Sequence, residues 1–339
     1  MWKKYLHLFI PFAVLAVVMC AGTFDASANV KGAQSEEKGL SVSAAKSDIE
    51  EIFFRTASEG TPQEMLDLLK GGGNVDRRDS NGNTALILAA GENTNPEMIK
   101  VLIAAKADVN ATNSRGLNVL MAAAERNINP SIITELVNAG ADVDEVGTDN
   151  TSPLLSSIFV NPNPAVVFEL IRLGADVNLP NKDGVTPLMA VCFEGRGIEI
   201  VESLLKAGAE ADARNSAGGT ALVYAVGTVI DIKVIESLLN AGADANAATV
   251  RGQTILHFAM YGSGATDVIG MLVERGADVN ARFREGITPL LIGIERRRPS
   301  ATIKLLLDAG ADLTAKDNEG RTALDIAKNT QGADASLFE

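Results

Sequence analysis

A leucine recurs along this chain at a constant spacing of 34 residues, and no insertion or deletion interrupts the series. A period of about 20–50 residues is typical of repeat proteins, in which each unit buries its apolar face by stacking on its neighbours. The chain is therefore predicted to fold as an array of similar units. The recurring residues are Leu86, Leu120, Leu154, Leu188, Leu222, Leu256, Leu290 and Leu324, with Ile52 in the preceding slot.

Each repeat carries the signals of two short helices. A glycine such as Gly184, or once Asn150, stands four residues before the leucine, where a turn needs positive φ. A Thr, Ser or Asn two residues before the leucine is a good helix N-cap, as Thr186 illustrates. In four repeats a second helix begins at a proline, and most second helices end at a glycine such as Gly208.

Two segments show a family resemblance. Asp183-Gly184-Val185-Thr186-Pro187-Leu188 with Gly208-Ala209, and Thr254-Ile255-Leu256-His257-Phe258-Ala259, resemble ankyrin repeats. The resemblance covers about residues 46–330. It implies an all-α solenoid of helix-turn-helix units with short β-turn or hairpin tips, here with a 34-residue period instead of about 33. The sequence departs from the ankyrin pattern at three places. Asn118-Val119 replaces Thr-Pro, Gly147 replaces the Asp or Asn before a turn, and Lys106 replaces the glycine that ends a second helix.

Residues 1–28 have the pattern of a signal peptide. A basic start at Lys3-Lys4 precedes the apolar run Leu6–Ala21, and Ala26-Ser27-Ala28 matches a signal peptidase site. We predict cleavage between Ala28 and Asn29. Two alternatives stay open: an uncleaved membrane anchor, because the run approaches the ~18 residues of a membrane span, and a lipoprotein modified at Cys20.

The remaining chain divides into a spacer and a repeat domain. Residues 29–45 are rich in Ser, Gly, Ala, Lys and Glu without periodicity, and are predicted to be a flexible linker. The ankyrin-repeat domain is expected at residues 46–339, with an N-terminal cap helix pair at 46–76, repeats at 77–315 and a C-terminal cap at 316–339. Terminal units must cover the apolar ends of a solenoid, so we expect Phe338 to fold back.

Composition argues against several classes of function. A formal net charge of −13 is unsuited to general nucleic-acid binding, which needs a basic face. After cleavage only His257 and Cys192 remain of two histidines and two cysteines, too few for a metal site. Cys192 lies in an apolar helical pattern, and His257 matches the structural histidine of the ankyrin motif. No catalytic motif is present, so we predict a non-enzyme without cofactor or metal.

The resemblance also implies where a partner would bind. Ankyrin solenoids bind through a concave groove of tips and first helices, whose variable positions lie at fixed offsets from the leucine. Here these positions hold eleven basic and eight acidic side chains, a net charge of +3, whereas the rest of the mature chain carries −17. The candidate binding residues are Arg115, Phe159, Lys182, Phe193, Arg214, Arg251, Tyr261, Arg282, Arg284 and Arg296.

Two readings of these positions stay open. The charges are either a binding surface or a solvated face of mixed sign, and the three aromatic residues are either binding anchors or packing between repeats. The other basic positions are Arg78, Arg126, Lys316 and Arg321, and the acidic positions are Glu92, Glu125, Asp149, Asp183, Glu194, Glu285, Glu295 and Glu319.

The sequence thus predicts a non-catalytic, monomeric protein-binding scaffold that is periplasmic or secreted. Its expected partner is a protein with an acidic face that docks across the fourth to seventh repeats, those of Leu188 to Leu290. Neither nucleic acid nor, after signal cleavage, a membrane is an expected partner. A secreted effector or a toxin-neutralising, immunity-type protein is the alternative.

Overall fold

A computed structural model describes residues 42–228, 231–262, 265–284, 286–330 and 335–338. The predicted signal peptide and most of the predicted linker lie outside these residues. The described residues form seventeen α-helices and a short 3-10 helix, and contain three isolated β-bridges but no β-strand. The predicted all-α fold is confirmed. Two compact units can be distinguished, at residues 42–176 and 177–338.

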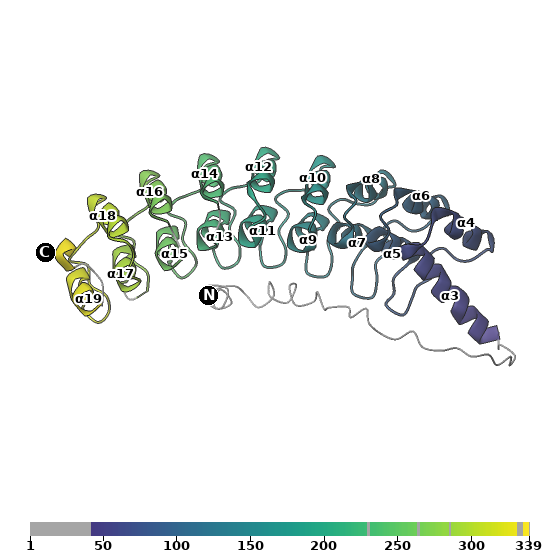
Figure 1. Cartoon of the computed structure of the whole chain (residues 1–339), viewed down its shortest axis with the longest axis horizontal. Coiled ribbons are helices and arrows are strands. Elements are labelled where there is room, and N and C mark those ends of the chain that lie inside the picture. The colour runs from purple at the N-terminus through teal and green to yellow at the C-terminus, as the bar shows by residue number, and fades with distance from the viewer. Residues whose placement is uncertain (1–41, 229–230, 263–264, 285, 331–334, 339) are drawn as a thin grey trace. The chain divides into compact units, whose positions relative to one another are not determined.

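In the unit of residues 42–176, four helix pairs are stacked in two layers (Figure 1). The first-layer helices are α3 (Val42–Glu59), α5 (Ala85–Glu92), α7 (Val119–Arg126) and α9 (Pro153–Val160). The second-layer helices are α4 (Pro62–Lys70), α6 (Pro96–Ala104), α8 (Pro130–Asn138) and α10 (Pro164–Arg172). Each helix contacts its neighbours within the layer and its partner in the other layer.

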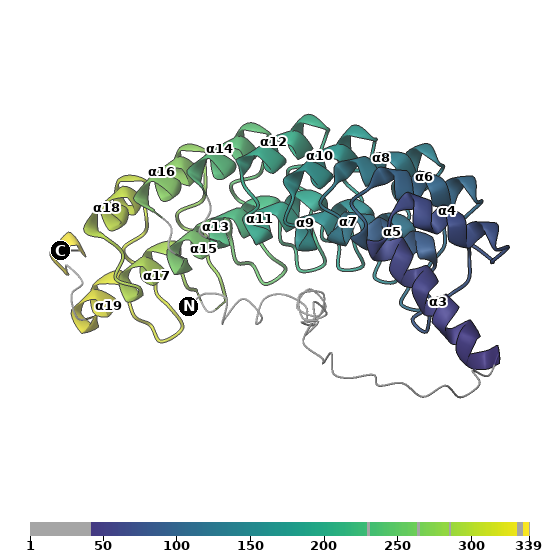
Figure 2. The same ribbon diagram turned by 45° about the vertical axis from the view of Figure 1, so that its right-hand side comes forward.

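The unit of residues 177–338 repeats this arrangement, and its two rows of helices are also visible in Figure 2. Its first layer holds α11 (Pro187–Glu194), α13 (Ala221–Gly227), α15 (Ile255–Tyr261), α17 (Pro289–Glu295) and α19 (Ala323–Asn329). Its second layer holds α12 (Ile198–Lys206), α14 (Ile232–Asn240), α16 (Thr266–Glu274) and α18 (Ser300–Asp308). The 3-10 helix η1 (Ala335–Phe338) packs on α19, and Phe338 is buried as expected.

The first helix is longer than the sequence pattern indicated. It begins at Val42, three residues before the expected end of the linker at residue 45, so residues 42–45 belong to α3. Ala44 and Ala45 favour this extension, because alanine has the highest intrinsic helix propensity. The compositional criterion grouped these small residues with the spacer and missed their helical preference.

The predicted N-caps all occupy the cap position of a first-layer helix. Seven of the eight accept a hydrogen bond from a main-chain amide of the first helical turn, as Thr186 does from Met189. The eighth cap, Thr254, is held by a different hydrogen bond: its main-chain amide donates to Nδ1 of His257 at 3.2 Å. These local bonds fix the start of each first helix, and the recurring leucine at its second position is then turned inward; Leu86, Leu154, Leu222 and Leu290 are fully buried.

Side chains at the end of several Ala-Asp-Val-Asn or related segments bond to the next repeat. Asn246 Oδ1 accepts from the amide of Asp278 at 2.7 Å, and its Nδ2 donates to the carbonyl of Gly276 at 2.8 Å. Asn280 makes the same two bonds one repeat later, to Asp312 and Gly310. The loops are therefore linked by hydrogen bonds as well as by apolar packing.

A second set of asparagines forms a buried ladder in the unit of residues 42–176. Asn127 Nδ2 donates to the carbonyls of Ala90 and Asn93, both at 2.9 Å. Asn161 Nδ2 donates to the corresponding carbonyls of Ala124 and Asn127, both at 2.8 Å. Asn93 begins the ladder on Ala57 and Gly60. Each asparagine thus satisfies carbonyl groups at the C-terminal end of the preceding first helix, where no intrahelical donor is available.

Lys106 adopts the backbone conformation of the glycine it replaces. Its φ is 70°, whereas Gly140 and Gly174 at the same position have φ of 99° and 92°. A side chain with Cβ is strained in this left-handed region. We expect Lys106→Gly to raise the free energy of unfolding by about 1 kcal/mol in urea denaturation. The substitution of glycine for Lys304, in the middle of α18, should instead lower the free energy of unfolding by about 1 kcal/mol. A lower free energy of unfolding for both variants would contradict the left-handed conformation assigned to Lys106.

Candidate protein-binding face

The predicted binding positions of residues 177–338 lie on the loops between repeats, here called tips, and at the ends of first-layer helices. Arg282 and Arg284 are on the tip before α17, and Arg251 is on the tip before α15. Arg296 is the C-cap of α17. These four arginines are exposed, as are Lys182 and Arg214 on earlier tips. The tip face, defined here as these tips and helix ends, thus presents several cations to solvent.

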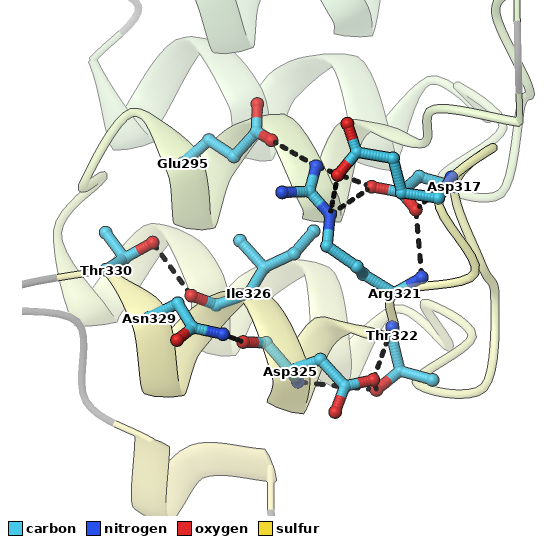
Figure 3. A network of polar contacts seen from close by, with 9 residues as sticks. Glu295, Asp317, Arg321, Thr322, Asp325, Ile326, Asn329 and Thr330 are labelled. Atoms are coloured by element: carbon cyan, nitrogen blue, oxygen red, sulfur yellow. Dashed lines mark hydrogen bonds and ion pairs between the residues drawn. The ribbon is translucent and has the colours of Figure 1, made fainter.

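Arg321 is neutralised by three carboxylates. Figure 3 shows its guanidinium directed at Asp317 and Glu295, with N–O distances of 2.7 and 3.4 Å, and Glu319 lies at 3.2 Å. Burial opposes the charge of Asp317, but hydrogen bonds from the Arg321 amide and guanidinium outweigh it and lower the pKa of Asp317. Arg321 therefore stabilises the last repeat and adds no free positive charge to the tip face.

Arg214 is likewise engaged within the protein. Its Nη1 donates to the carbonyl of Ala248 at 2.9 Å, and its Nη2 lies 3.9 Å from the carboxylate of Asp244. By contrast, within the described residues no ion pair involves Arg251, Arg282, Arg284 or Arg296. Among the described parts of the tip face, these four guanidinium groups therefore provide positive charge that no ion pair compensates.

Two of the four arginines stack on aromatic rings. The guanidinium carbon of Arg296 lies 5.0 Å from the ring centroid of Tyr261, and that of Arg284 lies 5.2 Å from that of Phe283. Tyr261 is half-buried: burial raises the pKa of its phenol, and the charges of Arg296 and Arg284 oppose that increase. Tyr261, Phe283, Arg284 and Arg296 are named the Tyr261 cluster below. Planar guanidinium groups held over rings are pre-organised donors for carboxylates.

Phe283 was missed by the sequence analysis because it is not at one of the variable positions. It stands where other tips have Asp79, Asn113 or Asp317, whose side chains accept two main-chain amides of the turn. Phe283 cannot accept these bonds and is buried against the ring of His257, with centroids 5.7 Å apart. The departure from Asp or Asn at this position was the available signal.

Phe193 contacts another repeat of its own unit. Its ring packs edge-on against that of Tyr224, with centroids 5.9 Å apart, and it is half-buried. This contact accounts for part of its surface as inter-repeat packing. Arg115 and Phe159 belong to the unit of residues 42–176, where Arg115 is exposed and Phe159 is half-buried. Glu285 lies outside the described residues.

The single cysteine and histidine of the described residues are enclosed. Burial raises the pKa of the Cys192 thiol to about 12, so the thiolate that a nucleophile requires is not formed near neutral pH. His257 Nδ1 contacts Thr254 Oγ1 at 2.7 Å and accepts from the Thr254 amide, and its Nε2 lies 3.1 Å from the Ile287 carbonyl. In the described part of the chain, no three His, Cys, Asp or Glu side chains are grouped to hold a metal ion.

The enclosure of His257 predicts a stability that depends on pH. Burial lowers the pKa of His257 below that of the unfolded chain. The unfolded state therefore binds the proton first, and stability is lost as pH falls below about 6.5, by up to about 1.4 kcal/mol per pH unit. His257→Met, which places the residue type of Met189 there, should remove this component from urea unfolding curves measured between about pH 7 and 5. If the free energy of unfolding changed with pH in the same way for both proteins, His257 would not contribute to the pH dependence.

Comparison with known proteins agrees with the architecture. A family model described as ankyrin repeats (3 copies) matches residues 53–147, 154–249, 196–283 and 231–317. The fold and these matches define a protein-interaction scaffold built from helical repeats. The chain belongs to the ankyrin-repeat family. No curated protein matches it. Among the described residues, none of the helices has the length and apolar character that crossing a membrane requires.

Proposed function

We propose that this protein is an exported, monomeric scaffold that binds a protein partner with an acidic face on the tip face of residues 177–338. The observation that supports this proposal is the group of four arginines that form no ion pair with any described residue, two of them held on aromatic rings, in a chain of net charge −13. An acidic partner would be repelled by most of the surface and attracted to this region. Such steering acts on the association rate and weakens with salt.

Export to the periplasm or beyond is supported by the pattern of residues 1–28. The mature chain would then begin at Asn29, which N-terminal sequencing of the protein recovered from the periplasmic or culture fraction tests directly. An intact Met1 in the soluble exported fraction would rule out the cleavage site.

The acidic partner class can be tested with poly-L-glutamate as the probe in stopped-flow association measurements. Arg282→Glu with Arg284→Glu should slow association by about tenfold at low salt and flatten its salt dependence. The matched control is Lys206→Glu with Lys233→Glu, which makes the same change of charge on exposed second-layer positions. It should have a much smaller effect.

Three results would contradict the proposal. No binding of poly-L-glutamate by the unmodified protein would remove the acidic-partner assignment. Equal effects of the two double variants would mean that overall charge, not the tip face, determines association. Binding of duplex DNA as tight as that of poly-L-glutamate would indicate a general polyanion site instead of a protein-binding face.

A further inference from the structure

The loop between α17 and α18 contacts the last turn of α15 through Arg298. The Nε of Arg298 donates to the carbonyl of Met260 at 3.1 Å, and its Nη2 donates to the carbonyls of Ala259 and Gly262. These carbonyls surround Tyr261, the last residue of α15. Although Arg298 lies only two residues from the exposed Arg296, its side chain is half-buried and binds main-chain oxygens.

Arg298 performs for α15 what the asparagine ladder performs for first-layer helices of the other unit. Asn127 and Asn161 each donate to two carbonyls at the end of the preceding first helix. By alignment of the repeats, Arg297 stands six periods after Asn93, in the position of the ladder. Arg297, however, has φ of 55° and is exposed, and the donors come from the next residue.

The same loop also holds the side chain of Tyr261. Arg296, two residues before Arg298, lies over the Tyr261 ring at 5.0 Å. The last turn of α15 is therefore held on its main chain by Arg298 and on its aromatic ring by Arg296. The positive charge of Arg298 is also favourable at this site, because the C-terminal end of a helix carries a partial negative charge.

We propose that Arg298 is the positioning residue of the Tyr261 cluster: by binding the carbonyls around Tyr261, it fixes the ring and the Arg296 guanidinium stacked on it in a conformation ready for a partner's carboxylate. This inference rests on the proposed binding function of the tip face. Fixing the cluster before binding avoids the ordering cost that would otherwise be subtracted from affinity. Lysine cannot replace Arg298, because an ammonium group lacks the planar fork that reaches several carbonyls at once.

The first test measures the position of Tyr261 without any partner. In a protein carrying Tyr5→Phe and Tyr224→Phe, Tyr261 is the only tyrosine, and its phenol can be titrated by ultraviolet absorbance. Arg298→Lys keeps the charge but should release the turn, so that the pKa of Tyr261 falls toward the ordinary value of about 10. Arg297→Lys, the same substitution at the adjacent exposed position, should leave the titration unchanged.

The second test measures binding of poly-L-glutamate. Arg298→Lys should weaken the affinity by about fivefold, because part of the binding free energy is then used to order the cluster, while Arg297→Lys should change it little. If Arg298→Lys does not fold, Arg298→Gln, which retains an amide donor, takes its place in both tests.

A purely structural role would have a different signature. It would lower the urea midpoint of Arg298→Lys and leave both the phenol titration and the affinity as in the unmodified protein, and this result would overturn the proposal. If the unmodified protein does not bind poly-L-glutamate, the proposal that its partner is acidic is wrong. The phenol titration still decides whether Arg298 positions Tyr261.

Discussion

Leu222→Ala is expected to lower the free energy of unfolding by about 2–5 kcal/mol, the range for a large-to-small change in a packed core. Leu222 is fully buried in α13, which packs between α11 and α15. Truncation would leave a cavity where two repeats meet, and a solenoid has no other core to compensate, because its stability comes from contacts between neighbouring repeats. Urea unfolding followed by circular dichroism measures the loss.

The effect should also be local. Hydrogen exchange should accelerate first in α11, α13 and α15, because only these first-layer helices share the cavity. Leu313→Ala is the matched control, since Leu313 is 39% exposed on a loop, and it should change the stability by less than about 0.5 kcal/mol. An unchanged midpoint for Leu222→Ala would contradict the register that places this leucine in the core.

Asn127→Leu is expected to cost about 3 kcal/mol, although leucine is similar in size and more apolar than asparagine. The side chain is buried, with 1% exposure, and donates to the carbonyls of Ala90 and Asn93 while its Oδ1 accepts from the amide of Asn129. The substitution leaves these main-chain groups without partners in an enclosed site. Each such loss costs about 1–3 kcal/mol.

The control for this prediction is the same substitution at Asn138, which is exposed at the end of α8. Asn138→Leu should shift the urea midpoint little. Hydrogen exchange should accelerate in α5 and α7 of the Asn127 variant, since the ladder joins these helices. If Asn127→Leu were as stable as the unmodified protein, burial of leucine would outweigh the lost hydrogen bonds, and the ladder would not stabilise this unit.

The candidate site was only partly predictable from the sequence. The offsets of the ankyrin pattern placed Arg251, Arg282, Arg284 and Arg296 on the exposed tips and helix ends, because those positions follow from a period that never slips. Charge counting treated every such arginine alike. It could not show that Arg321 is neutralised by three carboxylates, since Glu295 is 26 residues away along the chain.

Features that depend only on neighbouring residues could be derived from the sequence: the period, the caps at Thr84 or Thr186, the proline starts and the left-handed turn at Asn150. Hydrogen bonds that span three or four residues encode them, so one repeat contains all the information. Tertiary structure decided the rest. Whether Arg298 points to solvent or to the carbonyls of Ala259 and Met260 depends on a helix almost forty residues away. Only the stacking of one repeat on the next brings that donor and those acceptors together. Every residue has a main-chain carbonyl, so the residue type does not indicate which carbonyls will accept these bonds.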